Sequence, residues 1–411
     1  DFGLEYNINL RDYDNRIVDK IYEYDLNNLR YRSAEQQKDH FGYTDQNITA
    51  RYTNAETGKY AFQAKLNLNI SDSFSNGNGQ SVFSQGNLQN EHGTVHNRAS
   101  NYLNPTLDLY YSKNIGKKDE LSLNLVGSHY DTNSTQFDRE WILNSNQDVF
   151  NNDMILKAKQ NGIVAEVAHS HSFEKGKLNS GYRISNNSIS NDLQNLAGNS
   201  NYTVNYLQQY LYTEYSGKKD KFTYRLGLGL TNIHNKSAET TFDEWAFTPK
   251  IVLGYQLKNN QSIRFSSSYI PQSPSSDALS SNVVQVVPNI VRTGNPYLKS
   301  QHSFGNNLVY SFNSKYFDLN ANAFYWFRNR ASNQYYVLNQ NVDGYLLTYE
   351  NAKNSQQYGI QLTGSVKPFG NNLLVVKMVV APATEQLTTS RGYTFKNNYI
   401  GNYFNISTEY K

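Results

Sequence analysis

The sequence predicts an all-β fold, an antiparallel transmembrane β-barrel of about sixteen or seventeen strands. Three observations predict it. Apolar and polar residues alternate along many segments, short turns alternate with long polar connections, and aromatic residues make up 14% of the 411 residues. Because nothing in the composition divides the chain, we expect a single domain over residues 1–411.

Alternation with a period of two residues is clearest in residues 60–71. One face carries apolar side chains, namely Tyr60, Phe62, Ala64, Leu66, Leu68 and Ile70, and the other face is mainly polar. Strands of globular proteins have about 5–6 residues, whereas a tilted strand needs about 9–11 residues to cross a bilayer. Similar alternation recurs in residues 121–125, 222–231, 251–258 and 317–327. These segments therefore predict membrane-spanning strands.

The connections between these segments fall into two classes. Short polar connections lie at residues 55–59, 116–120, 174–177, 217–221, 258–261, 313–315 and 370–372. Long connections rich in Asn, Ser, Gly and Gln lie at residues 19–40, 72–95, 138–160, 190–201 and 271–301. Outer-membrane barrels have short turns on the periplasmic side and long loops on the extracellular side. The alternation therefore predicts which end of each strand faces out of the cell.

The composition is compatible with a membrane barrel despite a mean hydropathy of -0.71. Only every second residue of a spanning strand faces lipid, so the average hides the apolar face. Many of the 34 Tyr and 20 Phe residues cluster near the ends of the predicted strands. Tyr and Trp prefer the headgroup layer, although cross-strand aromatic pairing in a soluble sheet is the alternative. Lys and Arg are spread evenly, so we expect no nucleic-acid partner.

Several motifs follow one another in residues 245–369. Gly294-Asn295-Pro296 precedes Tyr297-Leu298-Lys299 at the end of a long connection, and Asn351-Ala352 precedes Tyr358-Gly359-Ile360 further along the chain. This order resembles the C-terminal barrel of Bacteroidetes-type TonB-dependent receptors and of the related outer-membrane β-barrel family. Gly and Asn tolerate positive φ and Pro fixes φ, so we interpret Gly294-Asn295-Pro296 as a turn and not as a binding site.

The resemblance implies a receptor barrel of about 22 strands, of which this chain would be a part. Two features depart from the family pattern. No N-terminal plug with a box for the energy-coupling protein is recognisable, and the sequence ends on Lys411 where such barrels end on an aromatic residue. We therefore expect a chain without its plug and its last strands. A smaller, complete barrel is the alternative.

The function that the resemblance implies is TonB-dependent uptake of a scarce nutrient across the bacterial outer membrane, such as a metal chelate, a cofactor or a glycan fragment. The expected partners are outer-membrane lipid, a TonB-type energy-coupling protein acting through a plug, and a surface lipoprotein. No bound cofactor is expected. The alternatives are a passive porin, an interaction or structural barrel, and a soluble secreted all-β protein.

The candidate ligand-binding segment lies within the connection 271–301. It is the least polar part of the long connections and consists of Val283, Val284, Gln285, Val286 and Val287. Binding residues concentrate on loops that a rigid scaffold positions. We expect this segment to contact ligand or to fold inward, and packing within the connection is the alternative.

Histidine pairs are the first candidates for metal chemistry. His92 and His96 have a spacing that binds zinc on a helix, but here they lie in a Gly- and Asn-rich connection. We therefore expect them to be solvated loop residues. His169 and His171 are two residues apart on a predicted strand, so both point to the same side, and no further metal ligand can be assigned.

The remaining candidates also fail to indicate chemistry. Asp277 within the Ser-rich residues 273–281 lacks the motif of a nucleophilic serine. The Gly-rich residues 75–79 are not followed by the helix that a phosphate site needs. Acidic residues in the connections could hold calcium, but the spacing of Asp131, Asp138 and Glu140 is not that of a known calcium loop. We expect the protein not to be an enzyme.

Overall fold

The computed structural model describes residues 1–408 except for residues 288 and 340–343. It is almost entirely β-structure, with a 17-stranded main sheet and a 4-stranded small sheet. The strands of the main sheet are β1 (Phe2–Leu26), β2 (Leu29–Glu56), β3 (Tyr60–Gln85), β4 (Leu88–Ile115), β5 (Asp119–Ile142), β6 (Asp148–Phe173), β7 (Gly176–Asn195), β8 (Gly198–Lys219), β9 (Phe222–Ser237), β10 (Thr241–Phe247), β11 (Lys250–Lys258), β12 (Gln261–Gln272), β15 (Gln301–Asn313), β16 (Phe317–Asn329), β19 (Asn354–Val366), β20 (Val375–Thr388) and β21 (Thr394–Ser407).

Neighbouring strands of the main sheet are antiparallel and follow one another along the chain. Both β10 and β11 pair with β9, which makes them two parts of one strand interrupted at Thr248 and Pro249. Pro249 has no backbone N–H to donate, but its carbonyl accepts from Tyr269, and Thr248 donates to Gly229. The all-β antiparallel fold and the predicted number of strands are confirmed.

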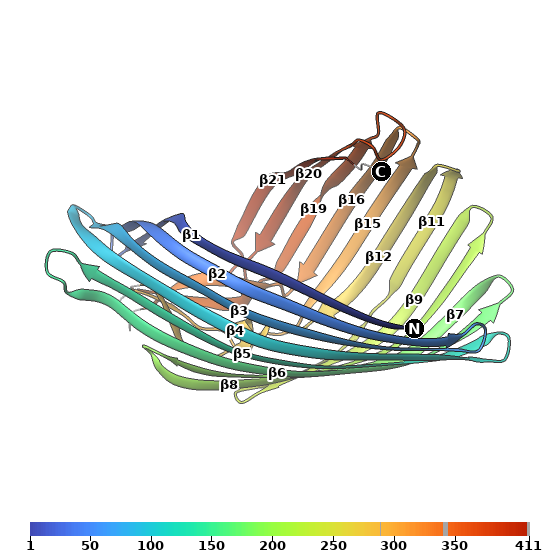
Figure 1. Cartoon of the computed structure of the whole chain (residues 1–411), viewed down its shortest axis with the longest axis horizontal. Coiled ribbons are helices and arrows are strands. Elements are labelled where there is room, and N and C mark those ends of the chain that lie inside the picture. The colour runs from blue at the N-terminus through green and yellow to red at the C-terminus, as the bar shows by residue number, and fades with distance from the viewer. Residues whose placement is uncertain (288, 340–343, 409–411) are drawn as a thin grey trace.

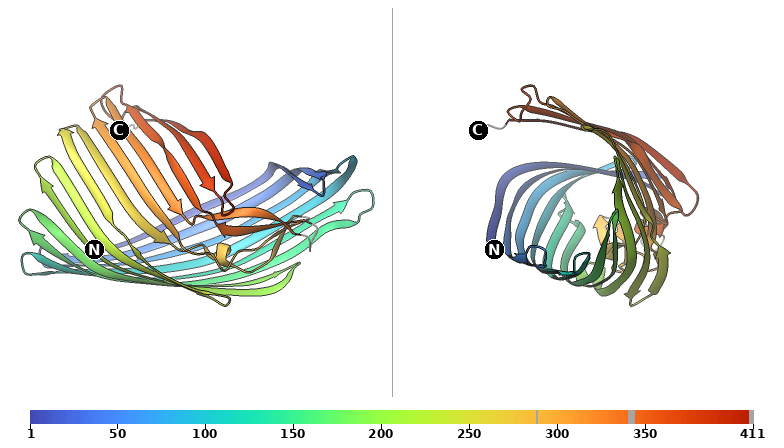
Figure 2. Two further views of the ribbon diagram at one scale, coloured as in Figure 1. Left: turned by 180° about the vertical axis from the view of Figure 1, so that it is seen from behind. Right: turned by 90° about the vertical axis from the view of Figure 1, so that its right-hand side faces the viewer.

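The main sheet curls strongly about its long axis (Figures 1 and 2). Within the described residues, β1 pairs only with β2, and β21 pairs only with β20. These two strands are therefore the edges of the sheet, and the wall is not closed between them. In lipid, every backbone polar group needs a protein partner, so both edges need hydrogen-bonding partners in the membrane.

The strands form because their apolar residues recur at every second position and can share one face. On β1 the outward side chains of Phe2, Leu4, Tyr6 and Ile8 are 49–73% exposed. The intervening residues are mainly polar and face the concave side of the wall. This arrangement is typical of a barrel whose outside faces lipid and whose inside faces water. No helix in the described part of the chain is long and apolar enough to cross a membrane.

The predicted short turns are confirmed, whereas four of the five predicted long loops are wrong. Residues 19–40, 72–95 and 190–201 are not loops but the paired ends of long hairpins, β1–β2, β3–β4 and β7–β8. The regular apolar alternation weakens in these mostly polar hairpin ends, although exposed apolar side chains such as Ile21, Val82 and Leu88 remain, while the backbone pairing continues. Asn27 and Asn28, with φ of 52° and 62°, form the tight β1–β2 turn.

Two further connections behave differently from one another. Residues 138–160 are also mostly strand, with a short loop at residues 143–147 between β5 and β6. Residues 271–301 are the one predicted long loop that remains a connection rather than a hairpin of the main sheet. This connection contains a short helix and two short strands.

Candidate functional site

The connection between β12 and β15 folds into a small structured unit. It contains α1 (Ser276–Leu279), β13 (Val284–Val287) and β14 (Ile290–Arg292). Strand β14 pairs in parallel with β18 (Gly344–Asn351), which pairs with β17 (Ser332–Asn339). We call residues 273–300 together with the β17–β18 hairpin the cap. The cap carries all four strands of the small sheet.

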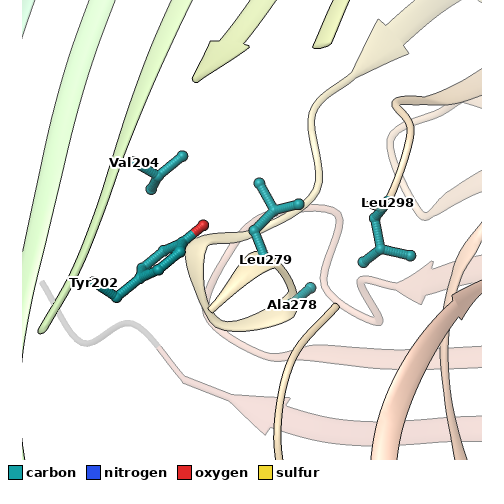
Figure 3. Packing of buried hydrophobic residues seen from close by; sticks show 5 residues of the cluster. All are labelled: Tyr202, Val204, Ala278, Leu279 and Leu298. Carbon is teal, nitrogen blue, oxygen red and sulfur yellow. The ribbon is translucent and has the colours of Figure 1, made fainter. Parts of the chain in front are cut away.

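The cap packs against the concave face of the main sheet. Figure 3 shows the contact, in which Tyr202 and Val204 of β8 meet Ala278, Leu279 and Leu298 of the cap. All five side chains are at most 4% exposed. Burial of a Leu side chain contributes about 1.5–3 kcal/mol, so this cluster holds the cap to the wall. Close by, the hydroxyl of Tyr206 donates to the carbonyl of Pro274 at 3.1 Å.

The Gly294-Asn295-Pro296 motif joins α1 to the small sheet. The backbone N–H groups of Gly294 and Asn295 donate to the carbonyls of Ser280 and Ala278 at 2.8 and 2.6 Å. The side chain of Asn295 accepts from Tyr297 N and donates to the carbonyl of Tyr349, both at 3.0 Å. The motif is therefore a hydrogen-bonded turn, as predicted, but the expected positive φ is wrong, because neither Gly294 nor Asn295 adopts it.

The cap also reaches the far end of the β1–β2 hairpin. The hydroxyl of Tyr345 donates to the carbonyl of Asp25, and the Asn289 amide donates to the Tyr24 hydroxyl at 3.4 Å. The rings of Tyr24 and Tyr345 meet edge to face, with centroids 6.2 Å apart. On the other side, the Asn195 amide of the β7–β8 hairpin donates to the carbonyl of Val283 at 2.8 Å. The cap thus bridges two hairpins that are distant along the sheet.

The predicted ligand-binding segment lies within the cap. Val284, Gln285, Val286 and Val287 make up β13, which pairs only with β14 within the described residues. Val283 and Val286 are 41% and 45% exposed, whereas Val284 and Gln285 are partly buried. The side chain of Val287 and residue Pro288 lie outside the described residues. The role of the segment in ligand binding stays a prediction.

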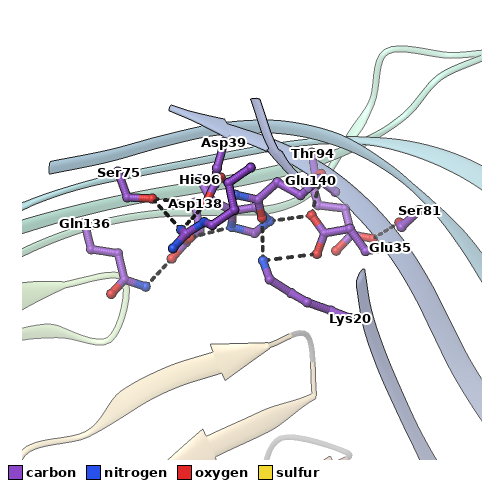
Figure 4. A network of polar contacts seen from close by, with 12 residues as sticks. Lys20, Glu35, Asp39, Ser75, Ser81, Thr94, His96, Gln136, Asp138 and Glu140 are labelled. Atoms are coloured by element: carbon purple, nitrogen blue, oxygen red, sulfur yellow. Dashed lines mark hydrogen bonds and ion pairs between the residues drawn. The ribbon is translucent and has the colours of Figure 1, made fainter. Parts of the chain in front are cut away.

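A network of charged side chains covers the concave side of the β1–β5 hairpin ends (Figure 4). The His96 imidazole lies between two carboxylates, with Nδ1 2.7 Å from Asp138 Oδ1 and Nε2 2.8 Å from Glu35 Oε1. The Lys20 ammonium lies 3.5 Å from Glu35 Oε2. His92 Nδ1 lies 2.6 Å from Glu140 Oε1. These contacts connect β1, β2, β4 and β5, across the intervening strand β3.

The network lies beyond the apolar, lipid-facing part of the strands, where its groups can titrate. Burial alone would lower the pKa of His96, but its hydrogen bonds to Asp138 and Glu35 outweigh burial and raise that pKa to about 9. Burial alone would raise the pKa of Glu35, but hydrogen bonds from His96 and Thr94 lower that pKa to about 2. The His96–Glu35 pair is therefore ionised at neutral pH.

The prediction of solvated loop histidines at positions 92 and 96 is wrong. Both residues lie on β4, and His92 is only 2% exposed. Residues four apart on a strand point to the same side, so both imidazoles face the carboxylates on β2 and β5. Gly77 of the Gly-rich segment 75–79 lies opposite, where a Cβ would collide with the side chains of Gln37 and Asp39. The glycine therefore leaves room for the network.

Of the other candidate residues, Asp138 and Glu140 belong to this network, Asp277 lies in the cap, and the rest lie elsewhere on the strands. His169 and His171 do point to the same side, and both contact Asp119 Oδ1, at 3.0 and 2.7 Å. Asp131 pairs with Lys159 at 3.7 Å. Asp277 lies in the first turn of α1. In the residues that the structure describes, no three His, Asp or Glu side chains are arranged to hold a metal ion.

The comparison with protein families agrees with this geometry. The model of the "Outer membrane protein beta-barrel family" matches residues 113–411, which is well over half of the chain. The chain belongs to this outer-membrane β-barrel family. Its place is accordingly the bacterial outer membrane, as the sequence predicts. A comparison with curated proteins gives no match.

Solved structures show the same fold at low sequence identity. The copper transporter OprC has a TM-score of 0.65 and 10% identity over 100% of this chain and 66% of its own length. The ferripyoverdine receptor of the Pseudomonas aeruginosa outer membrane has a TM-score of 0.62 and 11% identity, over 98% of this chain and 59% of its own. The siderophore receptor PirA from Pseudomonas aeruginosa has a TM-score of 0.51 and 11% identity, over 94% and 74%.

These similarities confirm the resemblance to receptors of the TonB-dependent type at the level of the fold. The chain spans 66% of the length of the copper transporter and 59% of the length of the ferripyoverdine receptor. All three named neighbours are transporters or receptors. The cap and the charged network could not be assigned from the sequence, because their residues are spread over distant hairpins.

Proposed function

We propose that this barrel is an outer-membrane receptor and transporter for a scarce nutrient, driven by a TonB-type energy-coupling protein. The nutrient is a metal chelate, a cofactor or a glycan fragment that binds on the outer side and passes along the polar concave face. Residues 1–411 act as one domain in this scheme. The chain binds and moves its ligand and does not transform it.

The observation that supports this function best is the position of the cap. The cap is buried against β8 through Leu279 and Leu298, and it contacts the β1–β2 hairpin through Tyr345. A passive porin needs an open mouth, whereas a receptor needs a structured surface that holds ligand before transport. The cap supplies such a surface, and the exposed Val283 and Val286 lie on it.

Solute depletion from a nutrient-limited medium tests the proposal, because this measurement does not require the ligand to be identified first. Cells with and without the gene are grown side by side, and the solutes that remain in the medium are measured by mass spectrometry. The same measurement is made after a protonophore has collapsed the proton-motive force. We expect one class of solute to be removed only by cells that carry the gene and only while the proton-motive force is intact.

The alternatives give different results in the same experiment. Removal of solutes that needs the gene but is insensitive to the protonophore would identify a passive porin. No difference between the two strains would overturn a transport function. A surface lipoprotein that copurifies with the barrel in that case would instead support an interaction barrel.

A further inference from the structure

A cavity lies in the concave wall beside the base of the cap. Its volume is about 410 Å3, which is within the range of about 300–1,000 Å3 common for ligand pockets. Its lining comes from β7, β8, β9, β11 and β12, including Pro271 of β12, and from Thr248 and Pro249 between β10 and β11. The cap begins two residues after Pro271, so the cavity adjoins the route from the cap along the wall.

The charges of this cavity have one sign. In the described part of the chain, Arg183 and Lys250 are its only charged lining residues, and no Asp or Glu contributes to the lining. Within the described residues the Arg183 guanidinium has no hydrogen-bond or ion-pair partner. Lys250 Nζ lies 3.6 Å from Glu214 Oε2, but this carboxylate also pairs with Arg225 at 3.2 Å. Two carboxylates lie next to the lining, since Glu166 is opposite Arg183 in the β6–β7 register and Glu214 is near Lys250, but with Arg225 the cations still outnumber them.

The rest of the lining is rich in hydroxyl groups. Ser185, Thr231, Thr248 and Ser268 line the cavity together with the phenols Tyr210 and Tyr269. Thr248 is only 7% exposed, and its buried Oγ1 lies close to the phenol of Tyr210. A ligand hydroxyl between these two groups would complete their hydrogen bonding. The hydroxyls suit a ligand that itself carries several hydroxyl groups.

We infer that this cavity binds a small organic oxyanion with a hydroxyl-bearing body. A carboxylate, phosphate or sulfate group of the ligand pairs with Arg183 and Lys250, because charge-assisted hydrogen bonds are about twice as strong as neutral ones. The body of the ligand lies against Tyr210 and hydrogen-bonds to Thr248. The inference rests on the proposed transport function and narrows its substrate to anionic, hydroxyl-rich solutes.

Binding to the purified full-length protein in nanodiscs tests the inference. The probes are glucuronate and glucose 6-phosphate, and glucose is the neutral counterpart of both. Isothermal titration calorimetry at low salt should give binding of at least one anion that is about tenfold or more tighter than that of glucose. Arg183→Gln and Lys250→Gln should each weaken this binding by about tenfold, and Arg183→Lys should retain part of it.

The matched control is Arg264→Gln. Arg264 lies on β12 like Ser268, and the even spacing places both on the concave face, but Arg264 does not line this cavity. This variant makes the same change of charge and should leave binding unchanged. Retention of the heat-dependent gel mobility typical of folded barrels shows that each variant is folded.

Two results would overturn the inference. One is binding of neither anion more tightly than glucose, and the other is binding that Arg183→Gln and Lys250→Gln leave unchanged. The titration needs no energy source, so it is independent of the proposed transport. Anion binding without energy-dependent uptake would overturn the transport function alone, whereas energy-dependent uptake without anion binding would overturn this inference alone.

Discussion

His96 Nε2 lies 2.8 Å from Glu35 Oε1, although the two residues are 61 positions apart in the chain. They meet because β2, β3 and β4 pair in a fixed register, with Glu35 opposite Ser81 and His96 opposite Gly77. The pair connects β2 to β4, which are separated by β3 with its Gly77. It therefore links the hairpin ends laterally, in addition to the backbone hydrogen bonds.

The first prediction concerns the pH dependence of this network. His96 has a folded pKa raised from 6.5 to about 9, so its stabilising effect is complete below about pH 6.5 and is lost as the pH rises through about 9. Glu35 has a folded pKa lowered from 4.5 to about 2, so its effect is complete above about pH 4.5 and is lost as the pH falls through about 2. The hairpin ends should therefore be most stable between about pH 4.5 and pH 6.5, where both effects are complete.

Nuclear magnetic resonance of the His96 ring in the folded protein checks this prediction. The wild-type imidazole should titrate well above the value of an unperturbed histidine, and Glu35→Gln should lower its pKa because the negative charge that favours the imidazolium is lost. Glu5→Gln removes a carboxylate that pairs with Arg51 elsewhere and serves as the control. A His96 pKa that Glu35→Gln does not change would contradict the proposed pairing.

Groups that face His96 come from every strand around it. Lys20 on β1, Glu35 and Asp39 on β2, Arg98 on β4 and Asp138 on β5 are charged, whereas the nearest part of β3 contributes glycine and serine. Arg16 from β1 also pairs with Asp39. The pH dependence is thus a property of the whole network.

The local pattern of the sequence was sufficient for the strands and for their short turns. Alternation in residues 60–71 predicts β3, and the polar residues 55–59 predict the turn around Gly58. Both features depend on residues close together in the chain. The membrane-spanning part is predictable because lipid imposes an apolar face on every strand.

The hairpin ends and the network could not be predicted from local patterns, because their contacts join residues that are far apart in the chain. Residues 19–40 and 72–95 are mostly polar and lack a regular apolar alternation, so no local pattern marks them as strand. His96 meets Glu35 and Asp138 only through the pairing register of β2 to β5, which no local motif encodes. One signal could have found the network. Counting residue pairs along each hairpin from its short turn gives the strand register, and the register places His96 near Glu35 and Asp138.

The second prediction concerns the contact between the cap and the β1–β2 hairpin. Tyr345→Phe removes the hydroxyl that donates to the Asp25 carbonyl but keeps the ring that packs on Tyr24. A neutral hydrogen bond contributes about 1 kcal/mol, so the cap should open locally about five times more often. Hydrogen exchange of β18 and of the end of β1 should then become faster.

The control for this contact is Tyr349→Phe. The Tyr349 hydroxyl accepts a hydrogen bond from Gln334 within the cap, at 2.7 Å, and makes no contact with the β1–β2 hairpin. This variant should change exchange in β17 and β18 but not at the end of β1. Equal exchange at the end of β1 in the Tyr345→Phe variant and in the wild type would show that the hydroxyl does not join the two elements.

The third prediction concerns Gly294 in the turn that follows α1. A Cβ at this position would collide with the backbone carbonyls of Ser280, Asp277 and Ala278, which cannot rotate away as a side chain could. Gly294→Ala should destabilise the cap by about 1–3 kcal/mol. Limited proteolysis should cut the cap faster in this variant. At Gly305 a Cβ would meet only the Trp326 side chain at 3.7 Å, so Gly305→Ala should leave the cleavage rate unchanged.

The fourth prediction concerns the apolar attachment of the cap to β8. Leu279 is 4% exposed and packs in the cluster with Tyr202 and Val204, so Leu279→Ala should cost about 2–5 kcal/mol of cap stability. A detached cap leaves the mouth open, and liposomes that carry the variant in the full-length protein should admit small sugars faster than wild-type liposomes. Leu338→Ala, at a cap residue that is 52% exposed, changes the same side chain without emptying the cluster. Equal permeability of both variants would show that the Leu279 contact does not hold the cap over the mouth.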